Sequence, residues 1–158
     1  MDVHSLTLGR TAEGDRYWRR PEDWPQWVKL VDIVQMNEGE AALLGAVATA
    51  PVDFLRDFGM RLLDLGPQSA VFTRGSEGVL AVYRDLRGRR QVSIPADRPE
   101  RAVDSTGCGD VFLAALAAHF CTTGDFEPAI RYATKAASLS SRLRGTHSLQ
   151  QLAQLRLD

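Results

Sequence analysis

One stretch of the chain has residue types and an order that suit phosphate binding and phosphoryl transfer. It is Asp104-Ser105-Thr106-Gly107-Cys108-Gly109-Asp110. It lies directly before an apolar stretch, residues 111–120, that predicts a helix buried nearly all round. Two glycines separated by one residue let the backbone turn tightly and approach a ligand closely. The amide groups at the start of the helix would then point at one spot, with the positive end of the helix dipole behind them. Such a helix start favours a phosphate group.

The aspartate that closes this stretch is the candidate base. A carboxylate at Asp110 could accept the proton of an attacking hydroxyl group, while the amides of Gly107, Cys108 and Gly109 hold the charge that develops on a transferred phosphoryl group. An ordinary glycine turn with Asp110 as the N-cap of the helix would show the same residues, because aspartate is a favoured cap. The Gly-x-Gly-Asp core alone leaves both interpretations open.

Composition and charge narrow the function classes. The 158 residues include 19 basic and 20 acidic side chains, a net charge of −1, and 44% are hydrophobic. This balance argues against a nucleic-acid-binding protein that neutralises phosphates. No apolar run approaches the roughly 20 residues of a membrane-spanning helix, and the N-terminal residues show no signal-peptide pattern, so we expect no membrane partner. The two cysteines, Cys108 and Cys121, form no Cys-x-x-Cys pair, which favours a cytoplasmic setting.

The elements that must position the candidate loop alternate as strands and helices at spacings typical of βα units. Strands are expected at 3–8, 32–36, 69–73, 79–83 and 91–94, and helices at 24–30, 41–44, 51–65, 111–120 and 126–143. The last two strands form a hairpin across 84–90, and residues 9–25 read as a long loop. We therefore predict an α/β fold, with a mainly parallel sheet flanked by helices and one antiparallel hairpin, and a single domain over residues 1–158.

The loop 104–110 closely resembles the C-terminal signature of the ribokinase-like, or PfkB, family of carbohydrate kinases, whose pattern is Asp-Thr-Thr-Gly-Ala-Gly-Asp. Here Ser105 and Cys108 replace a threonine and the alanine. The resemblance implies that Asp110 is the catalytic base for a sugar hydroxyl group, that the loop 107–109 is the anion hole, and that Asp104 lies near a site for a monovalent cation, K⁺. We reject Cys108 as a nucleophile, because its side chain replaces an alanine and the motif places no base beside it.

A second motif of that family lies upstream. Asn37-Glu38-Gly39-Glu40 matches its Asn-x-x-Glu pattern, and amide and carboxylate oxygens suit hydrated Mg²⁺. The resemblance implies that Asn37 and Glu40 act indirectly on Mg²⁺ and help to place the phosphates. A helix start, with Asn37 as the cap and Glu40 as its partner, explains the same residues, and both interpretations can hold at once.

Two more segments complete the resemblance, which covers residues 32–145. Residues 73–78 resemble the family's Thr-x-Gly-x-x-Gly turn at the ATP phosphates and ribose, although a simple strand-to-hairpin turn would look the same. Residues 132–138 resemble the helix of small residues that borders the adenine, although alanines that pack a helix would also look the same. The nucleotide-binding residues that the resemblance implies are Thr73, Gly75, Gly78, Thr134, Ser138 and Gly145.

The resemblance predicts an ATP-dependent sugar kinase that uses Mg²⁺, of which this chain is the C-terminal part of a truncated ribokinase-like fold. Full-length members are longer, and their N-terminal half carries the sugar-binding glycine pair and the lid. We expect a homo-oligomer, or a partner that covers the exposed sheet edge. A non-catalytic nucleotide-binding fragment of such a kinase, and a kinase for a vitamin precursor or nucleoside, remain alternatives. The absence of either glycine motif argues against a P-loop hydrolase and a Rossmann dehydrogenase.

Overall fold

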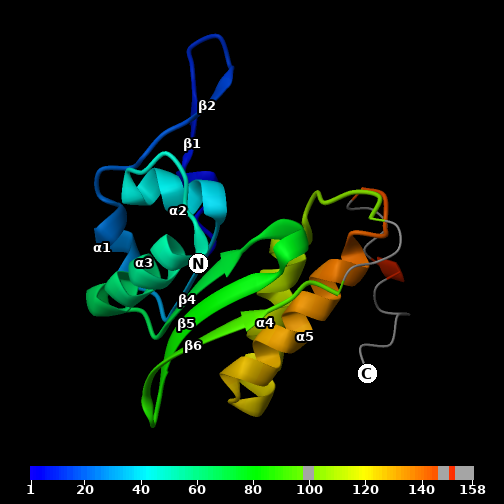
Figure 1. Cartoon of the computed structure of the whole chain (residues 1–158). Coiled ribbons are helices and arrows are strands. Elements are labelled where there is room, and N and C mark those ends of the chain that lie inside the picture. Colours follow the sequence, from blue (N-terminus) through cyan, green and yellow to red (C-terminus); the bar gives the residue numbers. More distant parts are fainter. Residues whose placement is uncertain (98–101, 146–149, 152–158) are drawn as a thin grey trace. The chain divides into compact units, whose positions relative to one another are not determined.

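The computed structural model describes residues 1–97, 102–145 and 150–151 (Figure 1). The chain divides into two compact units. We call Met1–Arg74 with Leu80–Ser93 the sheet unit, and Gly75–Val79 with Ile94–Asp158 the helix-pair unit. Among the described residues, no helix has the length and apolar character needed to cross a membrane.

The sheet unit is organised around a sheet with the strand order β3-β4-β5-β6. Its strands are β3 (Ile33–Asn37), β4 (Ser69–Thr73), β5 (Val79–Asp85) and β6 (Gly88–Ile94), of which the outermost residues Val79 and Ile94 belong to the other unit. Strands β3 and β4 are parallel, with Ile33 beside Ser69. The amide of Arg84 donates to the carbonyl oxygen of Gln68 at 2.9 Å, so the end of β5 lies beside the start of β4 and the two strands are antiparallel. A tight turn then joins β5 and β6 into the expected hairpin.

The N-terminal residues add a parallel segment beside β3. The amide of Val3 donates to the Gln35 carbonyl oxygen at 3.0 Å, and the Gln35 amide donates to the Met1 carbonyl oxygen at 2.8 Å. The strand expected at 3–8 is wrong in position, because the chain leaves the sheet at once in the 3-10 turn η1 (His4–Leu6). The side chain of Thr7, which is fully buried, closes this turn by donating to the His4 carbonyl oxygen at 2.8 Å.

The loop expected over residues 9–25 is also wrong in its first half. It contains β1 (Leu8–Arg10) and β2 (Arg16–Trp18), which pair antiparallel with Gly9 opposite Tyr17. A Cβ atom on Gly9 would lie 2.5 Å from the Tyr17 ring, so the absence of a side chain lets the ring cross the strand. The short helix α1 (Trp24–Val28) follows, as expected.

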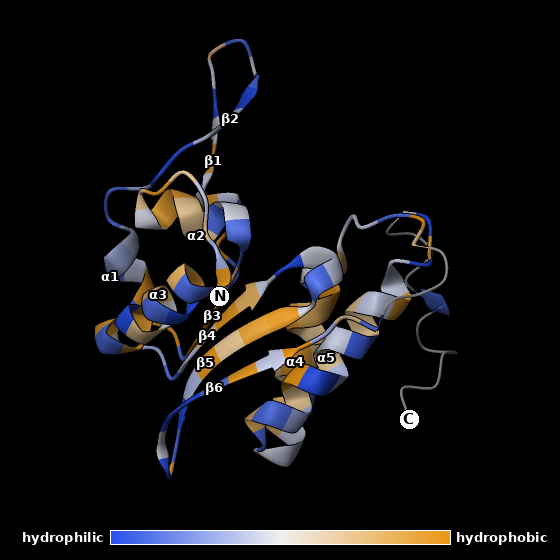
Figure 2. Ribbon diagram, viewed as in Figure 1, coloured by the Kyte–Doolittle hydropathy of each residue, from blue (hydrophilic) through white to orange (hydrophobic). Residues whose placement is uncertain are grey.

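Helices α2 (Glu38–Gly45) and α3 (Val52–Leu65) complete the sheet unit. In α3 the buried residues recur every three or four positions, as its amphipathic pattern predicts: Leu55, Phe58, Gly59, Leu62 and Leu63. The hydrophobic core cluster joins three of them to strand residues of β3 and β4: Leu55, Phe58 and Leu62 with Val34, Met36, Ala70 and Phe72. Most of β4 and β5 is coloured as hydrophobic in Figure 2.

The helix-pair unit contains the 3-10 turn η2 (Gly75–Glu77), α4 (Cys108–Thr123) and α5 (Phe126–Ser140). Helices α4 and α5 pack against each other. Of the α4 residues only Phe112 and Leu116 are buried, so the expectation of a helix buried nearly all round is wrong. Helix α4 is apolar on most of its circumference, but its neighbour in this unit covers only one stripe of it.

Candidate functional site

The Asn-x-x-Glu motif and the Thr-x-Gly-x-x-Gly turn both begin at the carboxyl ends of the parallel strands. Asn37 and Thr73, the last residues of β3 and β4, are register partners in the parallel pair. The Nε atom of Arg74 donates to Glu38 Oε1 at 2.9 Å, which ties the residues that follow the two strands together. The carboxyl ends of parallel strands are where open α/β sheets bind their ligands. Two segments selected from the sequence therefore begin side by side at the carboxyl ends of the strands, where a ligand site is expected.

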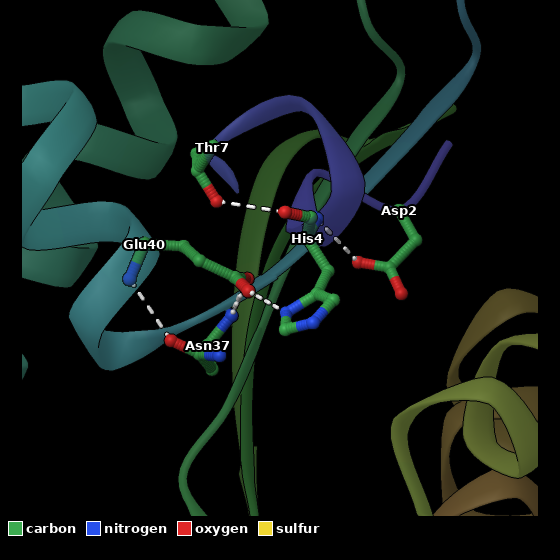
Figure 3. A network of polar contacts seen from close by, with 5 residues as sticks. All are labelled: Asp2, His4, Thr7, Asn37 and Glu40. Atoms are coloured by element: carbon green, nitrogen blue, oxygen red, sulfur yellow. Dashed lines mark hydrogen bonds and ion pairs between the residues drawn. The ribbon is translucent and has the colours of Figure 1, made fainter. Parts of the chain in front are cut away.

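Asn37 and Glu40 form a reciprocal capping box at the start of α2 (Figure 3). The Glu40 amide donates to Asn37 Oδ1 at 2.9 Å, and the Asn37 amide donates to Glu40 Oε2 at 2.8 Å. The second carboxylate oxygen, Oε1, lies 2.9 Å from His4 Nδ1, and the Glu40 side chain is only 2% exposed. This engaged carboxylate does not fit direct ligation of Mg²⁺, but it fits an indirect role.

His4 was not selected as a site residue from the sequence, since its partner lies 36 positions away. Among the residues that the structure describes, no group of three or more His, Cys, Asp and Glu side chains could hold a metal ion. A phosphate group or water could supply oxygen ligands to an ion at the carboxyl ends of β3 and β4.

The glycine loop of the helix-pair unit makes a tight turn into α4. Gly107 is the N-cap, with a left-handed φ of 78° that favours glycine. The Cys108 amide donates to the Ser105 carbonyl oxygen at 3.2 Å, and the first helical bond runs from the Val111 amide to the Gly107 carbonyl oxygen at 2.9 Å. Asp110 is an exposed residue of the first helical turn. The structure thus contradicts the interpretation of Asp110 as the N-cap, and it leaves this carboxylate at the positive end of α4.

Asp104 ties the beginning of this loop to the chain after α5. Its Oδ1 accepts a hydrogen bond from the Thr106 amide at 2.9 Å, and its Oδ2 accepts one from the Gly145 amide at 3.1 Å. The bonds from Thr106, and then the one from Gly145, lower the pKa of Asp104 below its ordinary value. The structure therefore brings together Asp104 and Gly145, two residues selected for different roles.

The Cys108 side chain makes a second connection to α5. Its Sγ atom is 3.2 Å from the Oγ atom of Ser140, which also donates to the Ala137 carbonyl oxygen at 2.8 Å. The Cys108 thiol is half-buried, and this packing agrees with a structural thiol. Ser140 was missed from the sequence, because nothing distinguishes a serine among the small residues of α5.

The remaining selected residues differ in what they can offer a ligand. The Thr134 hydroxyl group donates to the Ile130 carbonyl oxygen at 2.8 Å, so it is engaged within its own helix. Ser138 is half-buried. Gly75 has a φ of 51° and no heavy atom within 4 Å of a Cβ position, whereas Gly78 lies tightly against the backbone of Ile94. The open position at Gly75 is therefore the more accessible of the two.

The two units divide the selected residues between them. Asn37, Glu40 and Thr73 lie in the sheet unit. The helix-pair unit holds Gly75, Gly78, Asp104, Gly107, Cys108, Gly109, Asp110, Thr134, Ser138 and Gly145.

Comparison with known proteins places this architecture. The model of the pfkB family of carbohydrate kinases matches residues 14–152. The chain belongs to the pfkB family. Deoxyribokinase from Salmonella typhi is 32% identical over 117 residues, which are 74% of this chain and 37% of the relative. Ribokinase from Bacillus subtilis is 42% identical over 104 residues, 66% of this chain and 31% of the relative.

Solved structures show that this pfkB-family chain has a ribokinase-like fold. Ribokinase of Arabidopsis thaliana, complexed with ribose and ATP, superposes with a TM-score of 0.69 and 24% identity, over 84% of this chain and 44% of that one. A pyrophosphate-dependent kinase of the ribokinase family superposes with a TM-score of 0.74 and 19% identity, over 98% of this chain and 51% of that one. The chain spans about a third of the length of the curated relatives it matches.

Proposed function

We propose that the chain is the donor-binding and catalytic part of a kinase that transfers the γ-phosphoryl group of ATP to a hydroxyl group of a carbohydrate. The observation that carries the proposal is the position of Asp110, exposed in the first turn of α4 behind the left-handed Gly107. Family membership supports it, since the relatives named above are a ribokinase and a deoxyribokinase.

In the proposed reaction Asp110 accepts the proton of the substrate hydroxyl group. The hydroxyl oxygen forms a bond to the γ-phosphorus as the bond from that phosphorus to the bridging oxygen breaks, and ADP leaves. The loop 107–109, at the positive end of α4, stabilises the negative charge of the transferred group.

The donor residues of the proposal are those of the two nucleotide motifs. In the proposal Thr73, Gly75 and Gly78 accommodate the phosphates and ribose, and the open position at Gly75 supports this role. Thr134, Ser138 and Gly145 border the base in the proposal. The engaged hydroxyl group of Thr134 makes its small size, rather than its polarity, the useful property.

The cations belong to the proposal as well. Mg²⁺ would neutralise charge on the donor phosphates, and Asn37 and Glu40 would act on it indirectly, because the Glu40 carboxylate is engaged on both oxygens. K⁺ would lie near Asp104, whose carboxylate oxygens each accept one amide hydrogen bond and retain a further lone pair.

The proposal also includes a single domain and the cytoplasmic setting suggested by cysteine usage. It includes an oligomer, or a partner that covers the exposed sheet edge. Gel filtration with light scattering would test the assembly.

A second candidate function is nucleotide binding without transfer. It needs only the donor residues named above, Thr73, Gly75, Gly78, Thr134, Ser138 and Gly145. The acceptor class also stays a proposal, and a nucleoside or vitamin precursor is the alternative to a sugar.

Calorimetry with ATP, ADP and pyrophosphate in the presence of Mg²⁺ tests donor binding, and a transfer assay with ribose, deoxyribose and a nucleoside tests the acceptor. The Asp110→Asn variant should bind ATP within about threefold of wild type and lose about 10²-fold or more of any transfer. Asp125→Asn is the matched control, because Asp125 is an exposed acid at the N-cap of α5 whose side chain makes no capping bond.

Binding with transfer that depends on Asp110 supports the kinase. Binding without transfer supports the second candidate. Transfer that survives in Asp110→Asn contradicts the assignment of Asp110 as the base. Binding of pyrophosphate in place of ATP contradicts the assignment of ATP as the phosphoryl donor.

A further inference from the structure

The His4 side chain links the N-terminal segment to the Asn-x-x-Glu motif (Figure 3). Its Nδ1 atom is 2.9 Å from Glu40 Oε1, and a carboxylate oxygen accepts, so Nδ1 is the donor. The pair joins residues that are 36 positions apart, within the sheet unit. Nothing in the proposed chemistry above uses His4.

This bond completes the partners of a buried carboxylate. Glu40 is 2% exposed, and a buried charge is costly unless hydrogen bonds satisfy it. The Asn37 amide donates to Oε2, and His4 supplies the donor to Oε1. Without His4, Oε1 would lose this hydrogen bond, and the carboxylate would be less restrained against rotation away from Asn37.

His4 is itself held in place from several sides. The Thr7 hydroxyl group donates to the His4 carbonyl oxygen at 2.8 Å, and the His4 amide donates to Asp2 Oδ1 at 3.2 Å. The ring meets Trp18 edge-on, with 5.7 Å between the ring centroids. A donor fixed in this way can set the orientation of the group that accepts from it.

We propose that His4 is a positioning residue for the Asn37–Glu40 motif: it fixes the Glu40 carboxylate, and through the capping box it fixes Asn37, at the carboxyl end of β3. The proposal rests on the proposed function, because the motif then meets the Mg²⁺-bound donor phosphates in one geometry. His4 touches neither donor nor acceptor in this role. Its effect reaches the ligand only through Glu40.

Three variants separate the donor of His4 from its ring and from the turn that carries it. His4→Phe keeps a ring beside Trp18 but has no donor, whereas His4→Asn keeps a donor near the position of Nδ1 but has no ring. Thr7→Val removes a hydrogen bond of the same turn without touching Glu40. Each is measured by calorimetry with ADP, with and without Mg²⁺, and by hydrogen exchange of the Asn37 amide, which donates to Glu40 Oε2.

We expect His4→Phe to weaken Mg²⁺–ADP binding by about tenfold, as loss of an outer partner typically does, with ADP alone within about twofold. The Asn37 amide should exchange faster in this variant. His4→Asn and Thr7→Val should stay within about threefold of wild type on both measures.

Equal binding by His4→Phe and wild type overturns the proposal. An equal loss in His4→Asn also overturns it, because the ring and not the donor would then matter. An equal loss in Thr7→Val overturns it as well, because the turn alone would then matter. If the wild-type chain binds no nucleotide, the proposed function fails instead. Hydrogen exchange then decides on His4: faster exchange of the Asn37 amide in His4→Phe alone supports positioning, and unchanged exchange overturns it.

Discussion

Asn37 and Thr73 are register partners at the carboxyl ends of the parallel strands β3 and β4. Their pairing places the starts of two motifs, 36 positions apart in the sequence, side by side at the carboxyl ends of the two strands. Asn37 has a ligand role in the proposed function, and its side chain also caps α2. A substitution at Asn37 therefore affects stability even where no ligand is bound, and the two effects need separate variants.

We expect Asn37→Ala to lower the free energy of unfolding by about 0.5–2 kcal/mol, because the Glu40 amide loses its acceptor. Asn37→Asp should cost much less, since aspartate caps a helix equally well. Urea denaturation followed by circular dichroism measures both. An equal loss in the two variants would mean that the cap is not what Asn37 contributes to stability.

The pKa of Asp104 predicts a pH dependence of stability. Its pKa is lowered by hydrogen bonds from Thr106 and Gly145, so the ionised carboxylate favours the folded state. This contribution is complete above the ordinary value of 3.8 and is lost as the pH falls through the lower pKa of the folded protein. Wild type should therefore melt at a higher temperature than Asp104→Asn near neutral pH, and the difference should shrink below that value.

The measurement is thermal denaturation of both proteins across the acid range. Asp125→Asn removes the same charge at a residue whose side chain makes no capping bond. The difference in melting temperature between this variant and wild type should not shrink in the same way as the pH falls. A difference in melting temperature between wild type and Asp104→Asn that stays constant with pH would contradict the role given to the hydrogen bonds from the Thr106 and Gly145 amides.

Gly75 and Gly78 should respond differently to alanine although they belong to one turn. At Gly78, φ is 91° and a Cβ atom would lie 2.0 Å from the Ile94 carbonyl oxygen, which adds a steric clash to the cost of a left-handed backbone. We expect Gly78→Ala to cost about 2–5 kcal/mol. Gly75→Ala meets nothing within 4 Å, so only the backbone cost of about 1–2 kcal/mol remains. Chemical denaturation of the two variants gives the comparison, and similar losses would refute it.

The sequence predicts the regular elements well where local pattern decides them. The amphipathic spacing of residues 51–65 anticipates α3 (Val52–Leu65), and the apolar runs before Asn37 and Thr73 anticipate β3 and β4. The loop 104–110 likewise predicts a helix start, because a glycine in the left-handed conformation is a local requirement, although α4 begins at Cys108 and not at the expected residue 111. These features depend on neighbours a few positions away.

The features that the sequence does not reveal depend on distant partners. The β1–β2 hairpin has strands too short to show alternation, and its pairing depends on the contact of Tyr17 with Gly9. The contacts of Asp104 with Gly145, 41 positions away, and of His4 with Glu40 leave no pattern in one sequence. The exposure of α4 is also not predictable, because composition gives the apolar area of a helix but not how much of it is covered.

Gly59 shows how packing can override helix propensity. It lies within α3, where alanine would normally gain about 1 kcal/mol. A Cβ atom there would lie 2.6 Å from Val82 Cγ2 and 3.1 Å from Phe72 Cε2, and overpacking of this kind costs about 1–3 kcal/mol. We expect Gly59→Ala to be destabilising on balance, and Val82→Ala to cost at least about 0.5 kcal/mol less in the Gly59→Ala protein than in wild type, since it removes the crowding methyl groups. A double-mutant cycle by urea denaturation measures this coupling, and additive losses would mean that α3 shifts away from β5 to accept the methyl group.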